Sequence, residues 1–127
     1  MSQEKALDRA LTGTGAVTDF SGVWFNELKS KATIVQKKGV LSGTYESAVS
    51  SAGTSTVGDL RGYTDGMLIS FVVRWRDFQA ITAWVGHLDP LAKKPTIQTL
   101  WQMTKSVEQA DEEWTSINAG ADTFKRK

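Results

Sequence analysis

The sequence predicts an all-β protein, an eight-stranded antiparallel up-and-down β-barrel. After Phe20, apolar and polar residues alternate with the period of two that is typical of strands. Turn signals containing glycine, proline or aspartate separate these runs. Eight short strands joined by short connections are typical of an up-and-down barrel. A β-sandwich carries similar signals, and strand spacing alone does not distinguish the two folds.

The composition narrows the functional classes. The chain has 127 residues, with 15 basic and 14 acidic side chains and a formal net charge of +1. This balance gives no long-range attraction to nucleic acid or to an anionic membrane, so we expect neither as a partner. Without cysteine and with a single histidine, His87, the chain cannot form a disulfide or a multi-histidine metal site. We therefore expect no metal and no cofactor.

The N-terminal residues follow a different pattern. In 3–11 the apolar residues recur at 6, 7, 10 and 11, which suits a short amphipathic helix. A helix of this length is marginal in isolation. We expect 1–19 to be an arm, either helical or disordered, followed by a barrel domain over 20–127. Residues 1–20 hold no apolar run long enough for the core of a signal peptide.

Strands and turns follow in order. Lys37-Lys38-Gly39 and Thr64-Asp65-Gly66 predict tight hairpins. The small polar segment 48–56 predicts a mobile loop, and 104–113 predicts a longer, acidic one. The expected strands cover 21–29, 32–37, 40–47, 57–63, 67–75, 80–88, 96–104 and 114–125.

Alternation along each strand predicts the face that lines the barrel. In 67–75 the odd positions, from Met67 to Trp75, are apolar and face inward. In the first strand the inward positions are Trp24, Asn26, Leu28 and Ser30. Aromatic walls with a few convergent polar groups are typical of a small-molecule pocket, although each such residue taken singly is more often part of a core. The polar residues on aromatic-bearing inward faces are Asn26, Ser30, Tyr45, Ser47, Thr82 and Asp122.

Two motifs resemble the avidin/streptavidin family. Residues 22–30, GVWFNELKS, are similar to its first-strand motif G-x-W-[YF]-N-x-L-x-S, and 41–49, LSGTYESAV, to its motif L-x-G-x-Y-x-S-A-V. Further matches are Trp75, the segment 82–86, Trp101 and the segment 122–124. The resemblance implies a streptavidin-like barrel that binds and sequesters biotin, a bacterial avidin-like protein and a secreted or periplasmic location.

The resemblance also implies roles for single residues. Asn26, Ser30 and Tyr45 would donate hydrogen bonds to the ureido oxygen of biotin, and Asp122 and Ser47 would accept from its N–H groups. Thr82 would lie near the thioether, Trp75, Trp84 and Trp101 would wall the apolar bicycle, and Val49 and Ser51 belong to the loop that would close over the tail.

The resemblance further implies a homo-oligomer, with a tetramer expected and a dimer or a labile assembly left open. Trp114 resembles the tryptophan that each subunit of a tetramer lends to the pocket of its neighbour; the alternative is that it caps its own barrel.

Recognition of the biotin tail is predicted to differ from streptavidin. Ala80 falls where streptavidin has a serine, and the turn over 76–79 is shortened. The ureido end of the site therefore looks intact and the carboxylate end altered, with Ser50, Ser51 or loop amides as substitutes.

Three other functions fit the residues less well. A lipocalin-like carrier of a hydrophobic ligand also begins with a Gly-x-Trp strand, but such a ligand does not call for this set of polar residues. Catalysis is not expected, because no nucleophile pairs with His87, which has the opposite strand parity to Thr82 and Trp84. Stacking of single-stranded nucleic acid on the aromatic residues is disfavoured by the near-neutral charge.

Overall fold

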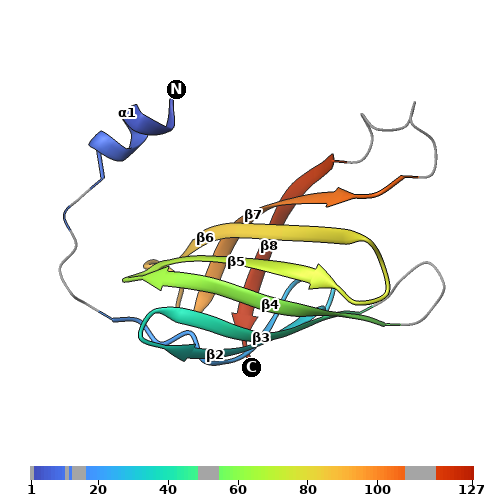
Figure 1. Ribbon diagram of the computed structural model, residues 1–127. Coiled ribbons are helices and arrows are strands. Elements are labelled where there is room, and N and C mark those ends of the chain that lie inside the picture. Colours follow the sequence, from blue (N-terminus) through green and yellow to red (C-terminus); the bar gives the residue numbers. More distant parts are fainter. Residues whose placement is uncertain (1, 11, 13–16, 49–54, 108–116) are drawn as a thin grey trace.

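The computed structural model is a closed barrel of eight antiparallel strands that follow one another in sequence order (Figure 1). It describes residues 2–10, 12, 17–48, 55–107 and 117–127. Each strand pairs with the next, and the first pairs with the last, which confirms the predicted fold class and excludes the sandwich. The elements are α1 (Gln3–Asp8), β1 (Gly22–Phe25), β2 (Lys31–Lys37), β3 (Val40–Ser47), β4 (Thr56–Asp65), β5 (Leu68–Trp75), β6 (Ala80–Leu88), β7 (Thr96–Lys105) and β8 (Ile117–Arg126).

The first strand is shorter than predicted. β1 ends at Phe25 because the next residues form a turn, in which the N–H of Lys29 donates to the carbonyl of Asn26 at 3.0 Å. Lys29 has a φ of 67°, so the chain changes direction there. Leu28 consequently points to solvent with 74% of its surface exposed, and its predicted inward position is wrong. Ser30 returns to the interior.

Both predicted hairpins form. Lys38 and Gly39 are the two central residues between β2 and β3, with φ values of 51° and 77°. Positive φ at both positions is the pattern of the turn whose twist matches that of the strands, and glycine adopts it without steric cost. Gly66 and Met67 join β4 to β5, with a positive φ of 58° at the glycine. Met67 therefore lies in a turn and is exposed, contrary to the inward position predicted for it.

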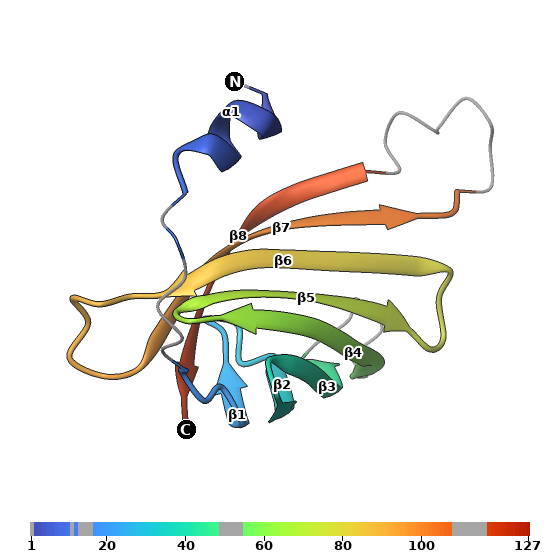
Figure 2. The ribbon, with the colours of Figure 1, turned by 60° about the vertical axis from the view of Figure 1, so that its left-hand side comes forward.

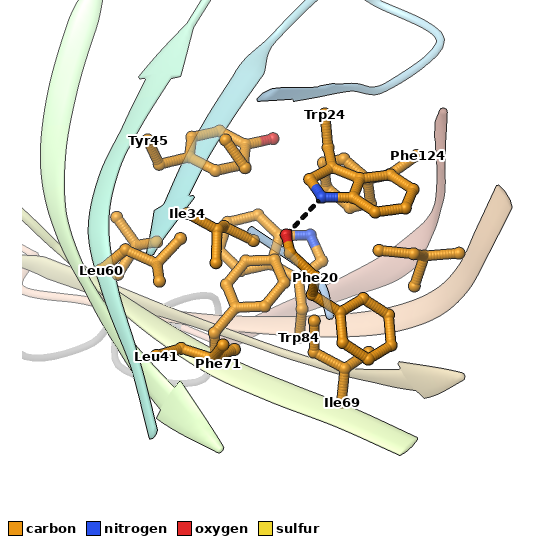
Figure 3. Packing of buried hydrophobic residues seen from close by; sticks show 13 residues of the cluster. Phe20, Trp24, Ile34, Leu41, Tyr45, Leu60, Ile69, Phe71, Trp84 and Phe124 are labelled. Carbon is orange, nitrogen blue, oxygen red and sulfur yellow. Dashed lines mark hydrogen bonds between the residues drawn. The ribbon is translucent and has the colours of Figure 1, made fainter. Parts of the chain in front are cut away.

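The barrel interior follows the predicted alternation. On β5, Ile69, Phe71 and Val73 are buried, while Leu68 and Val72 point outward. Burial of such side chains contributes roughly 25 cal/mol per Å² of apolar surface, which makes this interior the main source of stability. The buried cluster consists of Phe20, Trp24, Ala32, Ile34, Leu41, Tyr45, Leu60, Ile69, Phe71, Val73, Trp84, Ile97 and Phe124 (Figure 3).

One end of the barrel is filled by Phe20 and Trp24, both fully buried. The indole Nε1 of Trp24 donates to the carbonyl of Phe20 at 2.9 Å (Figure 3). The side chain of Gln36 accepts from the N–H of Phe20 and donates to the carbonyl of Thr18, both at 2.9 Å. The guanidinium of Arg126 lies 4.5 Å from the centre of the Trp24 ring. These contacts hold the segment before β1 across the end of the barrel.

The seam between the first and last strands is short. Only Trp24 and Phe25 of β1 pair with β8, opposite Arg126 and Lys125, whereas the pairing of β7 with β8 extends over most of both strands. Beyond the end of β1 a side chain continues the contact, since the N–H of Thr123 donates to Oε2 of Glu27 at 2.9 Å. Both sides of this seam contribute predicted site residues.

The helix α1 lies away from the barrel (Figures 1 and 2). Ser2 caps it by accepting from the N–H of Lys5, and none of its side chains is buried. It ends at Asp8, three residues earlier than predicted. No helix in the described part of the chain is long and apolar enough to cross a membrane.

Candidate ligand-binding site

Asn26, Ser30 and Tyr45 form a buried polar group inside the barrel, as the sequence predicted. The carboxamide oxygen of Asn26 accepts from the N–H groups of Leu28 and Ser30 at 3.0 and 2.9 Å. This fixes the orientation of the amide, because only its oxygen can accept from two backbone N–H groups. Its Nδ2 then lies 3.3 Å from the hydroxyl of Tyr45 and donates to it.

The hydrogen-bond partners leave donors available in this group. The hydroxyl oxygen of Ser30 accepts from the N–H of Ala48 at 3.1 Å, and that of Tyr45 accepts from Asn26. A hydroxyl whose oxygen accepts still has one O–H to donate, and Nδ2 of Asn26 has a second hydrogen. Each of the three side chains thus has one further hydrogen to donate; without a ligand, Ser30 interacts with Tyr45 and Asn26 with Asp122.

A carboxylate lies on the opposite side of the seam. Asp122 is partly buried on β8, and its Oδ2 accepts from the indole Nε1 of Trp84 at 2.9 Å. Burial raises the pKa of Asp122 above its ordinary value, and the nearby charge of Glu27 raises it further, against the lowering effect of the Trp84 donor. Burial acts on Glu27 too, but hydrogen bonds, first that from the N–H of Thr123, outweigh it and the pKa of Glu27 is lowered. Of the two carboxyl groups, Asp122 holds its proton more strongly.

The same environment affects Tyr45. Its pKa is raised, first by burial and then by the negative charge of Asp122, with the Ser30 hydroxyl acting in the opposite direction. The phenol therefore keeps its proton throughout the physiological range and stays a hydrogen-bond donor.

Aromatic rings surround these polar groups. The ring of Tyr45 stacks on Trp84 with centroids 4.7 Å apart and meets Trp75 edge to face at 5.6 Å. The indole Nε1 of Trp75 donates to the hydroxyl of Thr82 at 3.0 Å, and Thr82 is almost fully buried. The predicted residues Tyr45, Trp75, Thr82 and Trp84 thus form one connected wall across β3, β5 and β6.

Trp101 owes its position to a glycine. Trp101 on β7 pairs with Gly120 on β8 and is partly buried against the core. A Cβ added at Gly120 would lie 2.6 Å from Cζ2 and 2.8 Å from Cε2 of the indole. The indole therefore lies over the bare backbone of Gly120, a relationship that cross-strand register reveals and single-strand alternation does not.

A cavity of about 310 Å³ opens at the mouth of the barrel, the end away from Phe20. Its volume is at the lower end of the range for small-molecule pockets. Ser47 and Trp75 connect it to the predicted site, and Ala80 contributes no polar group. The lining also includes six residues that were not predicted as site residues: Thr56, Phe78, Gln79, Met103, Lys105 and Ser106.

Three predicted site residues, Val49, Ser51 and Trp114, lie outside the described residues. The others are described: Ser47 and Trp75 line the mouth cavity, and the remaining seven are buried or partly buried and do not line it. Every buried side-chain nitrogen or oxygen in the described part of the chain has a hydrogen-bond partner. Within the same residues, no group of three histidine, aspartate or glutamate side chains could hold a metal ion.

Comparisons with known proteins agree with the fold. The model of the avidin family matches residues 14–127. The chain is 29% identical over 115 residues to avidin-related protein 4/5 of Gallus gallus, covering 84% of this chain and 76% of the relative.

Two solved structures are similar to the barrel. The crystal structure of Xenavidin is 31% identical, with a TM-score of 0.73 and coverage of 86% of this chain and 98% of the other. The X-ray structure of the biotin binding protein from chicken is 27% identical, with a TM-score of 0.71 and coverage of 86% and 96%.

Proposed function

The chain belongs to the avidin family, and from this premise we propose that it binds biotin inside the barrel, without catalysis. The observation that carries the proposal is the orientation of Asn26. Its oxygen is occupied by the turn after β1, so its amide N–H groups point toward the hydroxyl of Tyr45 and the carboxyl group of Asp122.

The polar groups match the two sides of a ureido ring. The ring has one carbonyl oxygen, which accepts hydrogen bonds, and two N–H groups, which donate. Asn26, Ser30 and Tyr45 supply donors, and preorganised donors converging on one oxygen stabilise negative charge there. On the other side, Asp122 accepts from one N–H and Ser47 from the other. An ionised Asp122 is the better acceptor, because hydrogen bonds to charged groups are the stronger ones.

The apolar wall suits the remaining atoms. Trp75, Trp84 and Trp101 enclose the bicycle, and Thr82, held by Trp75, lies near the thioether. Because these side chains are already fixed by packing and hydrogen bonds, little ordering remains to oppose binding. Val49 and Ser51, in the loop after β3, remain predicted contacts to the tail.

The test is a thermal melt and a calorimetric titration with biotin. A ligand that binds only the folded protein raises its melting temperature, by an amount that grows with ligand concentration. We expect a higher midpoint and saturable binding. A protein that takes up a fatty acid or retinoid and ignores biotin would instead be a carrier of the lipocalin kind.

We also propose that the barrel assembles with copies of itself, as a tetramer. The outer face of β5 to β8 supports this, since Val85 and Leu100 lie side by side on it and are 62% and 69% exposed. Val72 and Ile81 extend the exposed apolar surface on the same strands. Contiguous exposed apolar surface is typical of protein–protein interfaces. Trp114 then contributes to the pocket of a neighbour.

Light scattering on a sizing column tests the assembly. We expect a mass of several chains for the native protein and a smaller mass for Leu100→Lys, whose charge cannot be buried without a partner. The control is Val35→Lys, which adds the same charge at an exposed apolar position on β2, outside this face. A native mass for Leu100→Lys would contradict this interface.

A further inference from the structure

At the mouth of the barrel, position 80 lacks the hydroxyl that the resemblance predicted for a ligand tail, and the polar side chains that line the cavity around it are neutral apart from Lys105. Ala80, at the start of β6, places a methyl group where the resemblance predicted a hydroxyl, and it lines the cavity. The carboxylate of a bound ligand would reach this region. An anion left without a partner in a partly enclosed cavity loses hydration, so another group must compensate for it.

Lys105 stands opposite this position. In the pairing of β6 with β7, Ala80 faces Lys105 directly. Lys105 also has the same strand parity as Trp101 and Met103, which face the interior, and it lines the mouth cavity beside Ala80. The small side chain of Ala80 leaves space for the longer one of Lys105 across the strand pair.

The backbone below Lys105 is held in place. The N–H of Ser106 donates to the carbonyl of Gln79 at 2.9 Å, so the end of β7 is joined to the turn between β5 and β6. The same turn places Phe78 on the cavity wall. Lys105 therefore projects from a fixed strand end, while its four-carbon stem retains freedom to follow a ligand.

Lys105 is also the charged member of the cavity lining. The other described lining residues are neutral. The salt bridge found among the described residues joins Arg76 to Asp59 at 2.8 Å, so no described carboxylate lies within ion-pair distance of Lys105. Lys105 thus lines the cavity and has no ion-pair partner among the described residues.

We propose that Lys105 binds the carboxylate of the ligand tail and makes this site selective for an acidic tail over a neutral one. The inference rests on the proposed function, because it assigns the tail end of the same ligand. The ammonium of Lys105 on β7 binds the carboxylate in place of the hydroxyl that is missing at Ala80 on β6. The ammonium of lysine is a compact charge without the fixed planar geometry of a guanidinium group. It can therefore bind the carboxylate of a flexible tail in several orientations.

Four dissociation constants test the proposal, those of the native protein and of Lys105→Gln for biotin and for biotinamide, whose tail is neutral. Partly exposed ion pairs are worth up to about fivefold in affinity, so we expect the native protein to prefer biotin by about two- to fivefold. Lys105→Gln should bind both ligands with the affinity that the native protein has for the amide. Lys105→Arg should retain the preference.

Lys37→Gln is the matched control, because Lys37 is an exposed lysine at the end of β2, at the opposite end of the barrel. It should keep the full preference. Raising the salt concentration should reduce the preference in the native protein and leave Lys105→Gln unchanged. If neither ligand binds the native protein, the proposed function fails. If both bind and Lys105→Gln prefers biotin as much as the native protein does, the role of Lys105 is wrong while biotin binding stands.

Discussion

The indole Nε1 of Trp84 donates a 2.9 Å hydrogen bond to Oδ2 of Asp122, which joins β6 to β8 across the barrel although β7 lies between them. The bond fixes an apolar wall residue and a charged acceptor relative to each other before any ligand is present. Glu27 and Asn26 are the other side chains that interact with this carboxyl group.

Asp122→Asn should weaken biotin binding and preserve the unliganded barrel. The amide oxygen can still accept from Trp84, but the charge that strengthens a ligand hydrogen bond is lost, at a cost of about 1.5–3 kcal/mol or roughly ten- to a hundredfold in affinity. The melting temperature without ligand should stay the same or rise. The reason is that the folded pKa of Asp122 is raised, so ionisation costs stability at neutral pH and a neutral amide removes that cost. Titration calorimetry checks the affinity for biotin, and a thermal melt without ligand checks the stability.

Biotin binding should weaken as the pH falls through the raised pKa of Asp122, since the protonated carboxyl is a poorer acceptor. Glu27→Gln removes the neighbouring negative charge and should shift the loss of binding to lower pH. Asp122→Asn should show no such step. Dissociation constants measured from neutral to acidic pH check this, and an identical profile for the native protein and Glu27→Gln would exclude the coupling.

Asn26 has two separable tasks, and two substitutions distinguish them. Asn26→Ala removes the acceptor for two backbone N–H groups and should lower stability by about 1–3 kcal/mol as well as abolish a donor to the ligand. Asn26→Asp keeps that acceptor but has no amide N–H, so it should also weaken biotin binding. At neutral pH it places a buried carboxylate beside Asp122, so its stability should recover as the pH falls and this carboxyl group is protonated, whereas the loss in Asn26→Ala should remain. Denaturant unfolding at neutral and acidic pH measures stability, and calorimetry measures binding. A loss in Asn26→Asp that persists at acidic pH and equals that of Asn26→Ala would contradict the role of the turn.

Gly120→Ala should displace the indole of Trp101. The added methyl group would lie 2.6 Å from Cζ2, and overpacking of this kind costs about 1–3 kcal/mol, or about tenfold in affinity where the displaced ring touches the ligand. Ala121→Ser, on the outward face of the same strand, is the control. Tryptophan emission and biotin affinity should change in the first variant and remain native in the second.

The sequence predicted the barrel because its strand pattern depends on local alternation, which survives in the structure wherever a strand is regular. Phe71, Thr82 and Trp84 are buried as their parity indicated, and His87 points away from them. The error at Leu28 arose because a turn that Asn26 stabilises through its side chain interrupts the alternation. No period within the strand reveals such a turn.

Strand alternation also predicted part of the candidate site. Asn26, Ser30, Tyr45 and Asp122 carry polar groups at inward positions, and a family resemblance gave them roles. Lys105 was missed because it ends a strand and is charged, and charged strand ends are usually solvated. Its importance depends on facing Ala80, which only the register between two strands defines.

The short seam between β1 and β8 has a consequence for the order of events during folding. Its strands come from opposite ends of the chain, so this is the pairing with the largest loop to close, and such contacts form late. Asn26 lies on one side of it and Asp122 on the other. The proposed ligand site is therefore complete only after β1 has paired with β8. Bound biotin would then slow the separation of β1 from β8. It would lower the unfolding rate and leave the refolding rate almost unchanged.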